Sequence, residues 1–534
     1  MRRLLLLLGC GLLAHSAVCG GSVPNAPERT PLWPEGKIPH FQETQIAAIG
    51  NPYSDKGFVA KEHQMPFLEW CTPPAESNRT GAVAILVSGG AYKRLCDVWL
   101  LELWRRNLTA AGVQCALLGY RSPRPEGLPI YQSAWEDGQR AVRVVRSEAK
   151  ARGYDPDKVI MFGMSAGAHL TALLATSSRT PAYEKVDALD DIPCNLNAAC
   201  TYAIAYGMTD GLTGQNTRAG LTDAQLDGIF KFDAATCPMW MSHGGNDPYS
   251  PSSSVEVYRR LRAMKVPAEL HLVPGKGHGA HAFHRAFEFL RQLGFLRPEG
   301  RSQRLDERFT FCREILAHSR EEIGDESTPF RPYIEWHSRK STTGFLLVAL
   351  SPGSNTVDRS TCYGFAPLWK WLGNKCRPTA VLHYRENEAQ KDVSRGLAQI
   401  RKQAEARGFS PRCIGVLGIR KGADLALRAA ADKSPDAKAN WAVAVSPTYA
   451  ECLSPDAGTS PVLILHGDLE GAAVEKSLDF WQNARRAGVQ GQFDSAVGVD
   501  EGFATVAQPG TGGWTWFDRL LEIFEYASKE SVKR

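Results

Sequence analysis

Short apolar runs alternate with amphipathic stretches along most of this chain. Residues 82–88, 113–120 and 159–163 are continuous apolar runs, as is typical of strands buried on both faces of a sheet. An amphipathic stretch at 134–146 lies between two of them and is typical of a surface helix. Strands that alternate with helices predict an α/β fold, in which a mainly parallel sheet is flanked by helices.

The alternation continues to the C-terminal part of the chain. After a charged stretch at 297–329, the same kind of pattern begins again. The further apolar runs lie at 237–243, 268–274, 345–350, 379–384, 413–419, 441–445 and 461–466. The pattern therefore predicts two successive α/β units.

Local sequence matches between the two units indicate a tandem duplication. Residues 159–170 (VIMFGMSAGAHL) recur as residues 414–425 (IGVLGIRKGADL), with Arg420 in the place of Ser165. Further matches follow in the same order, pairing 151–156 with 406–411, 66–70 with 332–336, and 120–121 with 384–385. We predict one domain at 21–296, a linker at 297–329 and a second domain at 330–534.

The N-terminus predicts export. Two arginines after Met1, an apolar run over 4–14 and small residues up to Gly20 are typical of a secretory signal peptide over residues 1–20. A lipoprotein signal ending at Cys10 would place the cysteine too early. No other run is long and apolar enough for a membrane helix, so we expect a secreted or periplasmic protein without a stable membrane span.

Composition and charge narrow the possible partners. With 43% hydrophobic and 22% charged residues, the chain has an ordinary globular composition, and its formal net charge of +5 is small for 534 residues. No long basic run is present, so we expect no nucleic-acid partner. The oligomeric state stays open.

The cysteines of an exported chain can form disulfides. Cys194 and Cys200 are close in sequence and are the best candidates for a local bridge, whereas Cys115 and Cys413 lie in apolar runs and are expected to be buried thiols. The sequence contains no C-x-x-C or H-E-x-x-H pattern, so we predict neither a metal site nor a cofactor.

Ser165 is the candidate nucleophile. It lies in Gly-Met-Ser-Ala-Gly between an apolar run and a helix-forming run, which is the context of a nucleophile elbow. A serine needs an imidazole to accept its proton and a carboxylate to hold the imidazole. Asp247 and His278 each follow a predicted strand in the required order, with His281 as the competitor of His278. The alternatives are a turn aspartate and a surface histidine.

A glycine-rich loop follows the run at 82–88. Backbone N–H groups that stabilise an oxyanion must approach the substrate without obstruction by side chains. We predict these donors at Gly90 or Ala91, together with Ala166, which follows Ser165. A plain glycine-rich turn is the alternative.

Residues 66–296 resemble the esterase/lipase superfamily of α/β-hydrolases, most closely its acetylxylan and feruloyl esterase branch. The segments that carry this resemblance are 88–92, 120–121, 137–142, 163–170, 246–247 and 277–279. The resemblance implies a secreted carboxylic-ester hydrolase that removes acetyl or feruloyl groups from plant polysaccharide fragments. It also implies that the segment 178–236 interrupts the sheet and covers the pocket. A carbohydrate-binding or scaffold protein and an exopeptidase-like serine hydrolase are the alternatives.

The second unit lacks the residues for this chemistry. Arg420 replaces the nucleophile, and a guanidinium stays protonated and cannot attack an ester. Glu470 lies at the position of the acid and Glu501 at that of the base, while Pro352-Gly353 stands at the oxyanion loop. We therefore predict an α/β-hydrolase-like domain without a catalytic triad.

Overall fold

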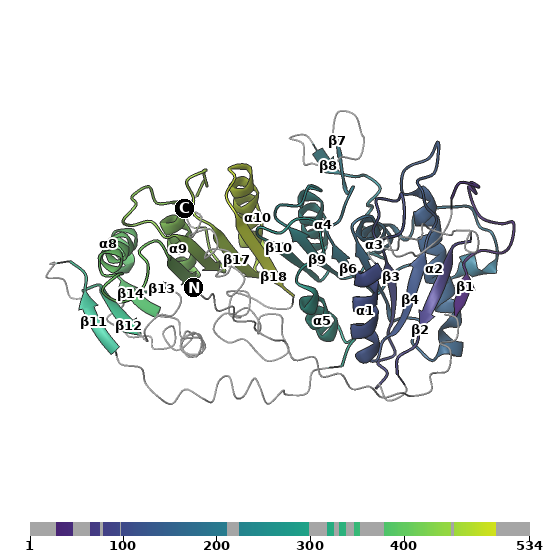
Figure 1. Ribbon diagram of the computed structural model, residues 1–534, viewed down its shortest axis with the longest axis horizontal. Coiled ribbons are helices and arrows are strands. Elements are labelled where there is room, and N and C mark those ends of the chain that lie inside the picture. Colours follow the sequence, from purple (N-terminus) through teal and green to yellow (C-terminus); the bar gives the residue numbers. More distant parts are fainter. Residues whose placement is uncertain are drawn as a thin grey trace, which may run out of the picture.

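The chain has an α/β fold built on one long, mainly parallel sheet. The computed structural model describes residues 28–45, 65–74, 78–96, 98–210, 224–297, 318–324, 331–337, 346–352, 379–449 and 453–497. Within them, a 16-stranded sheet extends through an elongated molecule, with helices on both of its faces (Figure 1). The predicted signal peptide, residues 1–20, lies outside the described residues.

The N-terminal half, residues 28–297, forms one end of this sheet. Its strands lie in the order β1-β2-β4-β3-β5-β6-β9-β10. Pairing is parallel from β4 to β10, and β2 is antiparallel to both of its neighbours. The strands are β1 (Arg29–Pro31), β2 (Phe67–Cys71), β3 (Val83–Val87), β4 (Gln114–Gly119), β5 (Val159–Met164), β6 (Ala198–Tyr202), β9 (Met239–Gly244) and β10 (Ala268–Val273).

The C-terminal half, residues 318–497, repeats this arrangement. From the centre outward its strands lie in the order β18-β17-β16-β15-β13-β14-β12-β11, and within this half β12 is antiparallel to both of its neighbours while pairing from β14 to β18 is parallel. The strands are β11 (His318–Glu322), β12 (Tyr333–His337), β13 (Leu346–Pro352), β14 (Thr379–Tyr384), β15 (Ile414–Ile419), β16 (Trp441–Val445), β17 (Val462–Gly467) and β18 (Gly491–Ala496). Strand β11 lies within the segment predicted as a linker.

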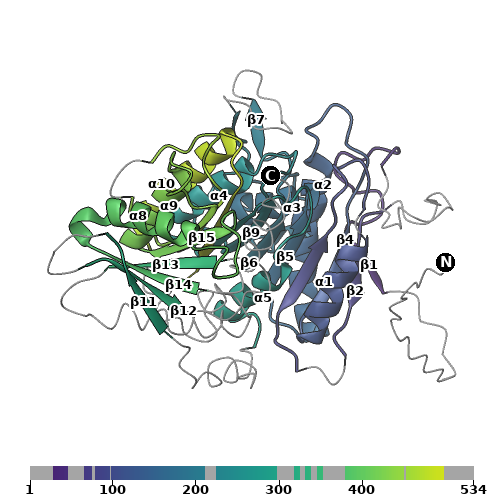
Figure 2. The same cartoon turned by 60° about the vertical axis from the view of Figure 1, so that its left-hand side comes forward.

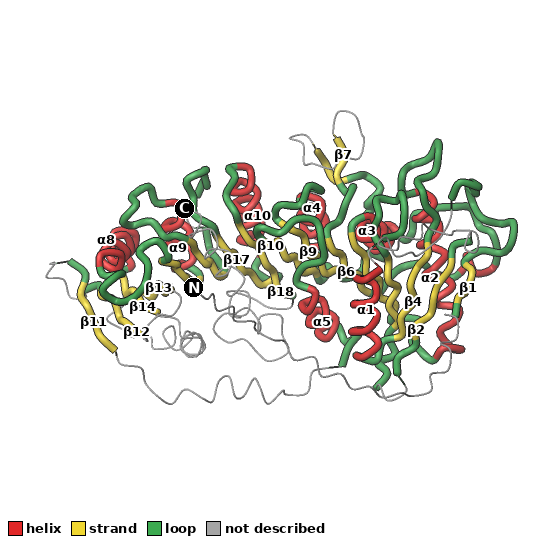
Figure 3. The backbone as a smooth tube through the Cα atoms, viewed as in Figure 1, coloured by secondary structure: helices red, strands yellow, loops and turns green. Residues whose placement is uncertain are grey.

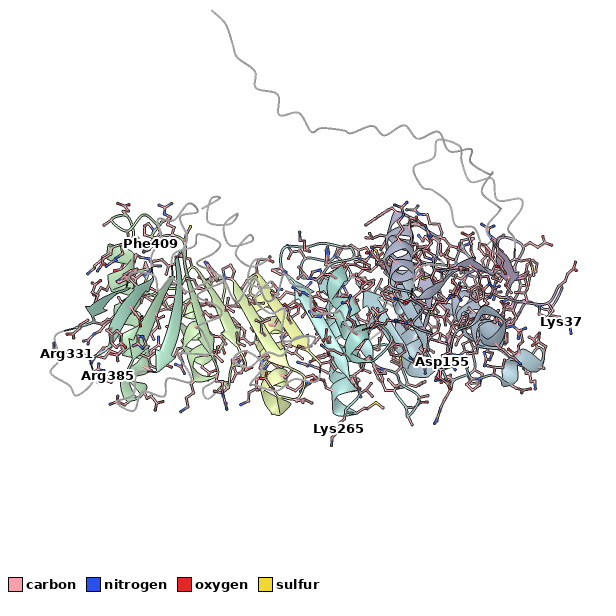
Figure 4. All side chains as sticks on the ribbon, turned by 90° about the horizontal axis from the view of Figure 1, so that it is seen from below. Lys37, Asp155, Lys265, Arg331, Arg385 and Phe409 are labelled. Atoms are coloured by element: carbon pink, nitrogen blue, oxygen red, sulfur yellow. The ribbon has the colours of Figure 1, made fainter. Side chains whose placement is uncertain are left out.

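A buried ion pair recurs in both halves after the third strand from the outer edge of the sheet, which is β4 in one half and β14 in the other. The backbone N–H of Arg121 donates to Asp137 at 2.8 Å, and the guanidinium binds the same carboxylate. Arg385 makes the equivalent contacts with Asp392, with an N–H···O distance of 2.9 Å. Arg385 lies at the opposite end of the molecule from Lys37 of the N-terminal half (Figure 4). This correspondence is what a tandem repeat would give.

The helices divide between the two faces of the sheet (Figure 3). Helices α1 and α5 pack into one hydrophobic layer, and the others pack into the opposite layer. The helices are α1 (Val98–Ala110), α2 (Gln132–Arg152), α3 (Ala166–Ser177), α4 (Ser252–Ala263), α5 (Phe283–Gln292), α8 (Ala389–Lys402), α9 (Lys421–Ala431) and α10 (Gly471–Arg486). No helix in the described ranges is long and apolar enough to cross a membrane.

The resemblance implied that the segment 178–236 interrupts the sheet and covers the pocket, but part of this segment lies within the sheet. Residues Ala198–Tyr202 form β6, a buried strand between β5 and β9 at the centre of the N-terminal half. Only the small hairpin of β7 (Met208–Asp210) and β8 (Ala224–Leu226) forms a sheet of its own, above the main one in Figure 1. The prediction is wrong for 198–202 because this short run of small residues lacks a strong β-strand pattern.

The expected Cys194–Cys200 bridge is also wrong. Both cysteines are free thiols. Cys200 is buried in β6, where burial raises the pKa of its thiol well above the usual range, and Cys194 Sγ donates to the carbonyl oxygen of Ser178. Cys115 is a buried free thiol, as predicted, whereas Cys413 is only half-buried.

The two halves meet edge to edge at the centre of the sheet. Strands β10 and β18 pair antiparallel, with His271 opposite Asp494 and Leu272 opposite Phe493. Helices α4 and α10 lie side by side over this junction in two views (Figures 1 and 2). The antiparallel pairing turns the second half by a half-turn relative to the first, so the same face of each half carries its main helices.

Buried charges cross this junction. Asp494 Oδ1 lies 2.8 Å from His271 Nδ1 and 3.1 Å from Arg285 Nη1, while Gln492 Nε2 donates to Asp494 Oδ2 at 2.8 Å. Glu269 Oε2 approaches His271 Nε2 at 3.2 Å. All of these side chains are buried. Because buried charges are tolerated only when they are paired, the network fixes the register between the halves.

Replacing Asp494 with alanine should therefore destabilise the whole protein. The change removes the buried carboxylate that binds both Arg285 and His271, and breaking a buried ion pair costs about 3–5 kcal/mol in the free energy of unfolding. Urea denaturation checks this, with Asp479→Ala as the control because Asp479 makes an exposed junction ion pair with Arg259, worth about 0–1 kcal/mol. Equal losses in the two variants would contradict the assignment.

Candidate active site

Ser165 lies in a tight turn between β5 and α3. Its backbone φ of 58° and ψ of −119° are unusual for a residue with a side chain, at a cost on the order of 1–3 kcal/mol. A Cβ on Gly163 would lie 2.2 Å from the carbonyl oxygen of Gly167, and one on Gly167 would lie 2.5 Å from that of Ser88. The two glycines are therefore required because α3 begins directly against β3 and β5.

The sheet brings Ser165 to the same edge as the predicted acid and base. Ser165 N donates to the carbonyl oxygen of Tyr202 at 2.9 Å, directly after the paired ends of β5 and β6. Gly245 N donates to that of Val273 at 2.7 Å, where β9 and β10 end. Since all four strands are parallel, the three loops that follow them emerge at one edge, which is where α/β folds place their sites.

Asp247 and His278 form a hydrogen-bonded pair at this edge. His278 Nδ1 lies 2.8 Å from Asp247 Oδ2, and Tyr249 N donates to Asp247 Oδ1 at 2.8 Å. The Asp247 side chain is fully buried and that of His278 is 26% exposed. Burial favours the neutral acid, but hydrogen bonds from His243 and His278 hold the pKa of the Asp247 carboxyl well below its usual range. The ionised carboxylate orients the imidazole.

The competing histidine makes a different contact. His281 Nε2 lies 2.9 Å from the carbonyl oxygen of Gly277, and burial lowers the pKa of its imidazole. Of the two candidate bases, His278 is thus the one that contacts Asp247. Among the described residues no hydrogen bond joins Ser165 Oγ to His278, and such bonds often tighten only when substrate binds.

The predicted oxyanion loop has an unusual backbone. Gly90 has a φ of 121°, and a Cβ there would lie 1.9 Å from the carbonyl oxygen of Arg94. Ala91 also has a positive φ, of 59°, and its carbonyl oxygen accepts a hydrogen bond from Arg124 Nε at 2.9 Å. Ala166 is the first residue of α3, so its N–H has no partner within the helix. Ala166 directly follows Ser165, and the role of Gly90 or Ala91 as the second donor stays a prediction.

A chain of side chains that the sequence did not reveal connects this loop to the histidine. Arg124 Nη2 donates to Tyr206 Oη at 2.9 Å, and Tyr206 Oη lies 3.3 Å from Tyr249 Oη. The ring of Tyr249 packs against that of His278, with 4.8 Å between ring centroids. No local motif marks these residues, since they come from three separate loops.

His243 is a second residue that no motif in the sequence marks. It lies in β9 and is fully buried. Its Nε2 lies 3.3 Å from Asp247 Oδ2, and its Nδ1 lies 2.8 Å from Ser254 Oγ. It therefore approaches the same carboxylate oxygen of Asp247 that His278 contacts.

Arg420 occupies an elbow of the same shape in the C-terminal half. Its φ of 56° and ψ of −119° match those of Ser165, and its N–H donates to the carbonyl oxygen of Val445 at 2.9 Å. A Cβ on Gly418 would lie 1.9 Å from the carbonyl oxygen of Gly422. The C-terminal half thus keeps the strained turn of the elbow but carries Arg420 in the place of the serine.

The acid position of this half is occupied by a similar pair. Glu470 Oε2 lies 2.6 Å from His466 Nδ1, and His466 is fully buried at the end of β17. The pair corresponds to Asp247 and His243. Glu501 and Gly353, which we placed at the base and oxyanion positions, lie outside the described residues.

Comparisons with known proteins found a family model, curated relatives and solved structures that are similar to parts of this chain. The BD-FAE family model matches residues 71–226, which contain Gly90, Ala91, Ser165 and Ala166. Endo-1,4-beta-xylanase B of Butyrivibrio fibrisolvens is 24% identical over 208 residues, or 36% of this chain and 32% of that protein. Esterase LipQ of Mycobacterium tuberculosis is 27% identical over 212 residues, or 35% of this chain and 47% of that protein.

Solved structures were also found. The acetyl ester-xyloside bifunctional hydrolase from Caldicellulosiruptor lactoaceticus has a TM-score of 0.38 and 20% identity, covering 51% of this chain and 100% of that one. An esterase from Thermogutta terrifontis has a TM-score of 0.37 and 21% identity, covering 44% of this chain and 90% of that one. The chain spans between 32% and 47% of the length of the curated relatives it matches. Over the matched part of the chain, the family model and the curated relatives thus indicate a similarity to the esterase branch of the α/β-hydrolases.

Proposed function

We propose that this protein is a serine carboxylic-ester hydrolase that removes acetyl or feruloyl groups from plant polysaccharide fragments. The observation that carries the proposal is the Asp247–His278 pair, at the sheet edge where Ser165 occupies a strained elbow. An exported enzyme would meet such substrates outside the cell, and the predicted signal peptide would deliver it there.

The geometry supports a two-step acyl transfer. His278 takes the proton of Ser165 while the hydroxyl oxygen attacks the ester carbonyl, and Asp247 stabilises the imidazolium that forms. The N–H group of Gly90 or Ala91, together with that of Ala166, binds the oxyanion of the tetrahedral intermediate. His278 then protonates the departing sugar hydroxyl, and water, activated by the same imidazole, releases the acid from Ser165.

The substrate class rests on the family match and on the xylanase among the relatives, together with the resemblance to acetylxylan and feruloyl esterases. A panel of p-nitrophenyl acetate, methyl ferulate and acetylated xylan tests it. Release of acetate or ferulate from the last two supports the proposal. If the protein hydrolyses p-nitrophenyl acetate but neither methyl ferulate nor acetylated xylan, it is an ester hydrolase, and the proposed polysaccharide substrate is wrong.

We infer that the C-terminal half does not hydrolyse esters itself. Its elbow carries Arg420, whose guanidinium stays protonated and cannot become an acyl-transfer nucleophile. Ser446 and Ser477 contact the Glu470–His466 pair, but neither lies at the elbow, where Arg420 stands. The half retains the strand order and the strained turn of the first, so we assign it a role in supporting the other half.

Turnover should not depend on an added metal ion. The proposed steps use only a hydroxyl, an imidazole and a carboxylate, so incubation with EDTA should change the rate on p-nitrophenyl acetate by less than about twofold. Within the described ranges no group of three or more His, Cys, Asp or Glu side chains could hold a metal ion. Loss of activity in EDTA that zinc or calcium restores would contradict this mechanism.

A further inference from the structure

The C-terminal half reaches across the junction to both loops that carry the proposed acid and base. Arg485, in the last turn of α10, donates from Nε to the carbonyl oxygen of Gly245 at 3.1 Å. Gln490, directly before β18, accepts a hydrogen bond at Oε1 from the N–H of Gly275 at 3.3 Å. Gly245 lies two residues before Asp247, and Gly275 lies three residues before His278.

The two loops are packed tightly onto each other. Asn246 N donates to the carbonyl oxygen of Lys276 at 2.9 Å. A Cβ on Gly244 would lie 2.3 Å from the carbonyl oxygen of Gly277, so the backbones are in direct contact. A displacement of one loop would therefore move the other, and the Asp247–His278 pair with them.

A cavity lies between the acid loop and the C-terminal half. Its volume is about 360 Å³, and its lining includes Asp247, Trp481 and Arg485. Trp481 is held in place by its Nε1, which donates to the carbonyl oxygen of Gly491 at 3.0 Å. Since side chains do not fill this space, the hydrogen bonds from Arg485 and Gln490 hold the loops across it.

A separate set of contacts fixes α10 itself. Arg259 of α4 forms an ion pair with Asp479 at 2.5 Å, and Arg262 donates to the carbonyl oxygen of Gly471 at 3.0 Å. These contacts lie along the shared helix pair and do not touch the loops of Asp247 and His278. Junction stability and loop positioning are thus served by different residues.

We propose that Arg485, assisted by Gln490, is a positioning residue, through which the C-terminal half holds the loops of Asp247 and His278 in their productive arrangement. This inference rests on the proposed function. It gives the half with Arg420 a definite role in the reaction of the other half. Arg485 acts through the backbone of the acid loop and does not contact substrate.

The test uses the full-length chain with Arg485→Ala, Arg485→Lys and Gln490→Ala. Loosening an acid–base pair by a fraction of an ångström costs on the order of 10- to 10²-fold in rate, so we expect kcat on p-nitrophenyl acetate to fall by that factor in Arg485→Ala. KM should change little, and the rate of labelling by a fluorophosphonate should fall in parallel with kcat. Gln490→Ala should show a smaller loss, and Arg485→Lys should recover part of the activity because its ammonium can reach the same carbonyl.

Arg259→Ala is the matched control, since it removes junction ion pairs without touching the loops. It should leave kcat and the labelling rate unchanged. An equal loss in Arg259→Ala and Arg485→Ala would overturn the proposal in favour of general junction stability, as would wild-type kcat and labelling in Arg485→Ala. A wild-type protein that neither turns over esters nor reacts with the probe would instead reject the proposed function and this inference with it.

Discussion

Replacing Ser165 with alanine should lower ester turnover by on the order of 10³-fold or more and leave the fold unchanged. The hydroxyl is the only part of the side chain that the reaction uses, and the methyl group of alanine occupies the place of the serine Cβ. The strained backbone of the elbow is held by the close contacts of Gly163 and Gly167, which the substitution leaves in place.

The measurement is kcat/KM on p-nitrophenyl acetate, together with the thermal unfolding midpoint. Ser147→Ala is a suitable control, because Ser147 lies on α2 and its hydroxyl donates only to the carbonyl oxygen of Val144 in the same helix. If Ser165→Ala keeps most of its turnover, the nucleophile has been assigned wrongly.

Replacing Asp247 with asparagine should reduce turnover by about 10⁴-fold. The amide has nearly the same shape but no charge, so it cannot stabilise the imidazolium of His278 and favours the wrong tautomer. His243 Nε2 would also face an uncharged group in place of the carboxylate that it now approaches at 3.3 Å.

The control for this variant comes from a similar turn elsewhere. Asp247 Oδ1 accepts a hydrogen bond from the N–H of Tyr249, and Asp233 Oδ1 accepts one from the N–H of Ala235 in the same way. Asp233→Asn should therefore keep wild-type turnover. Similar activities for the two variants would mean that Asp247 is only a turn residue, which is the alternative that the sequence left open.

The parts of the fold that could be predicted from sequence are those with a local signature. Strands β3, β5, β15 and β17 are buried on both faces, so their residues form continuous apolar runs. Strand β18 has no such run because Gln492, Asp494 and Ser495 interrupt it. Asp494 pairs with Arg285 and His271, and Ser495 accepts a hydrogen bond from the backbone of β10, so the partners that permit their burial lie more than 200 residues away.

The same distinction applies to the candidate site. Ser165 is marked by two glycines within two residues, and Asp247 and His278 each follow a strand, so local sequence suffices to propose them. Arg124 and Arg485 carry no such mark, because each acts on a backbone carbonyl of a distant loop. Contacts of this kind depend on how the sheet brings loops together, which no short pattern encodes.

The most direct test of the central claim is the intact mass of the full-length protein after reaction with a fluorophosphonate, followed by peptide mapping. We predict a single adduct per chain, carried by the peptide that contains Ser165 and absent from Ser165→Ala. An unmodified protein, an adduct that persists in Ser165→Ala, or one that maps to the C-terminal half would contradict the account.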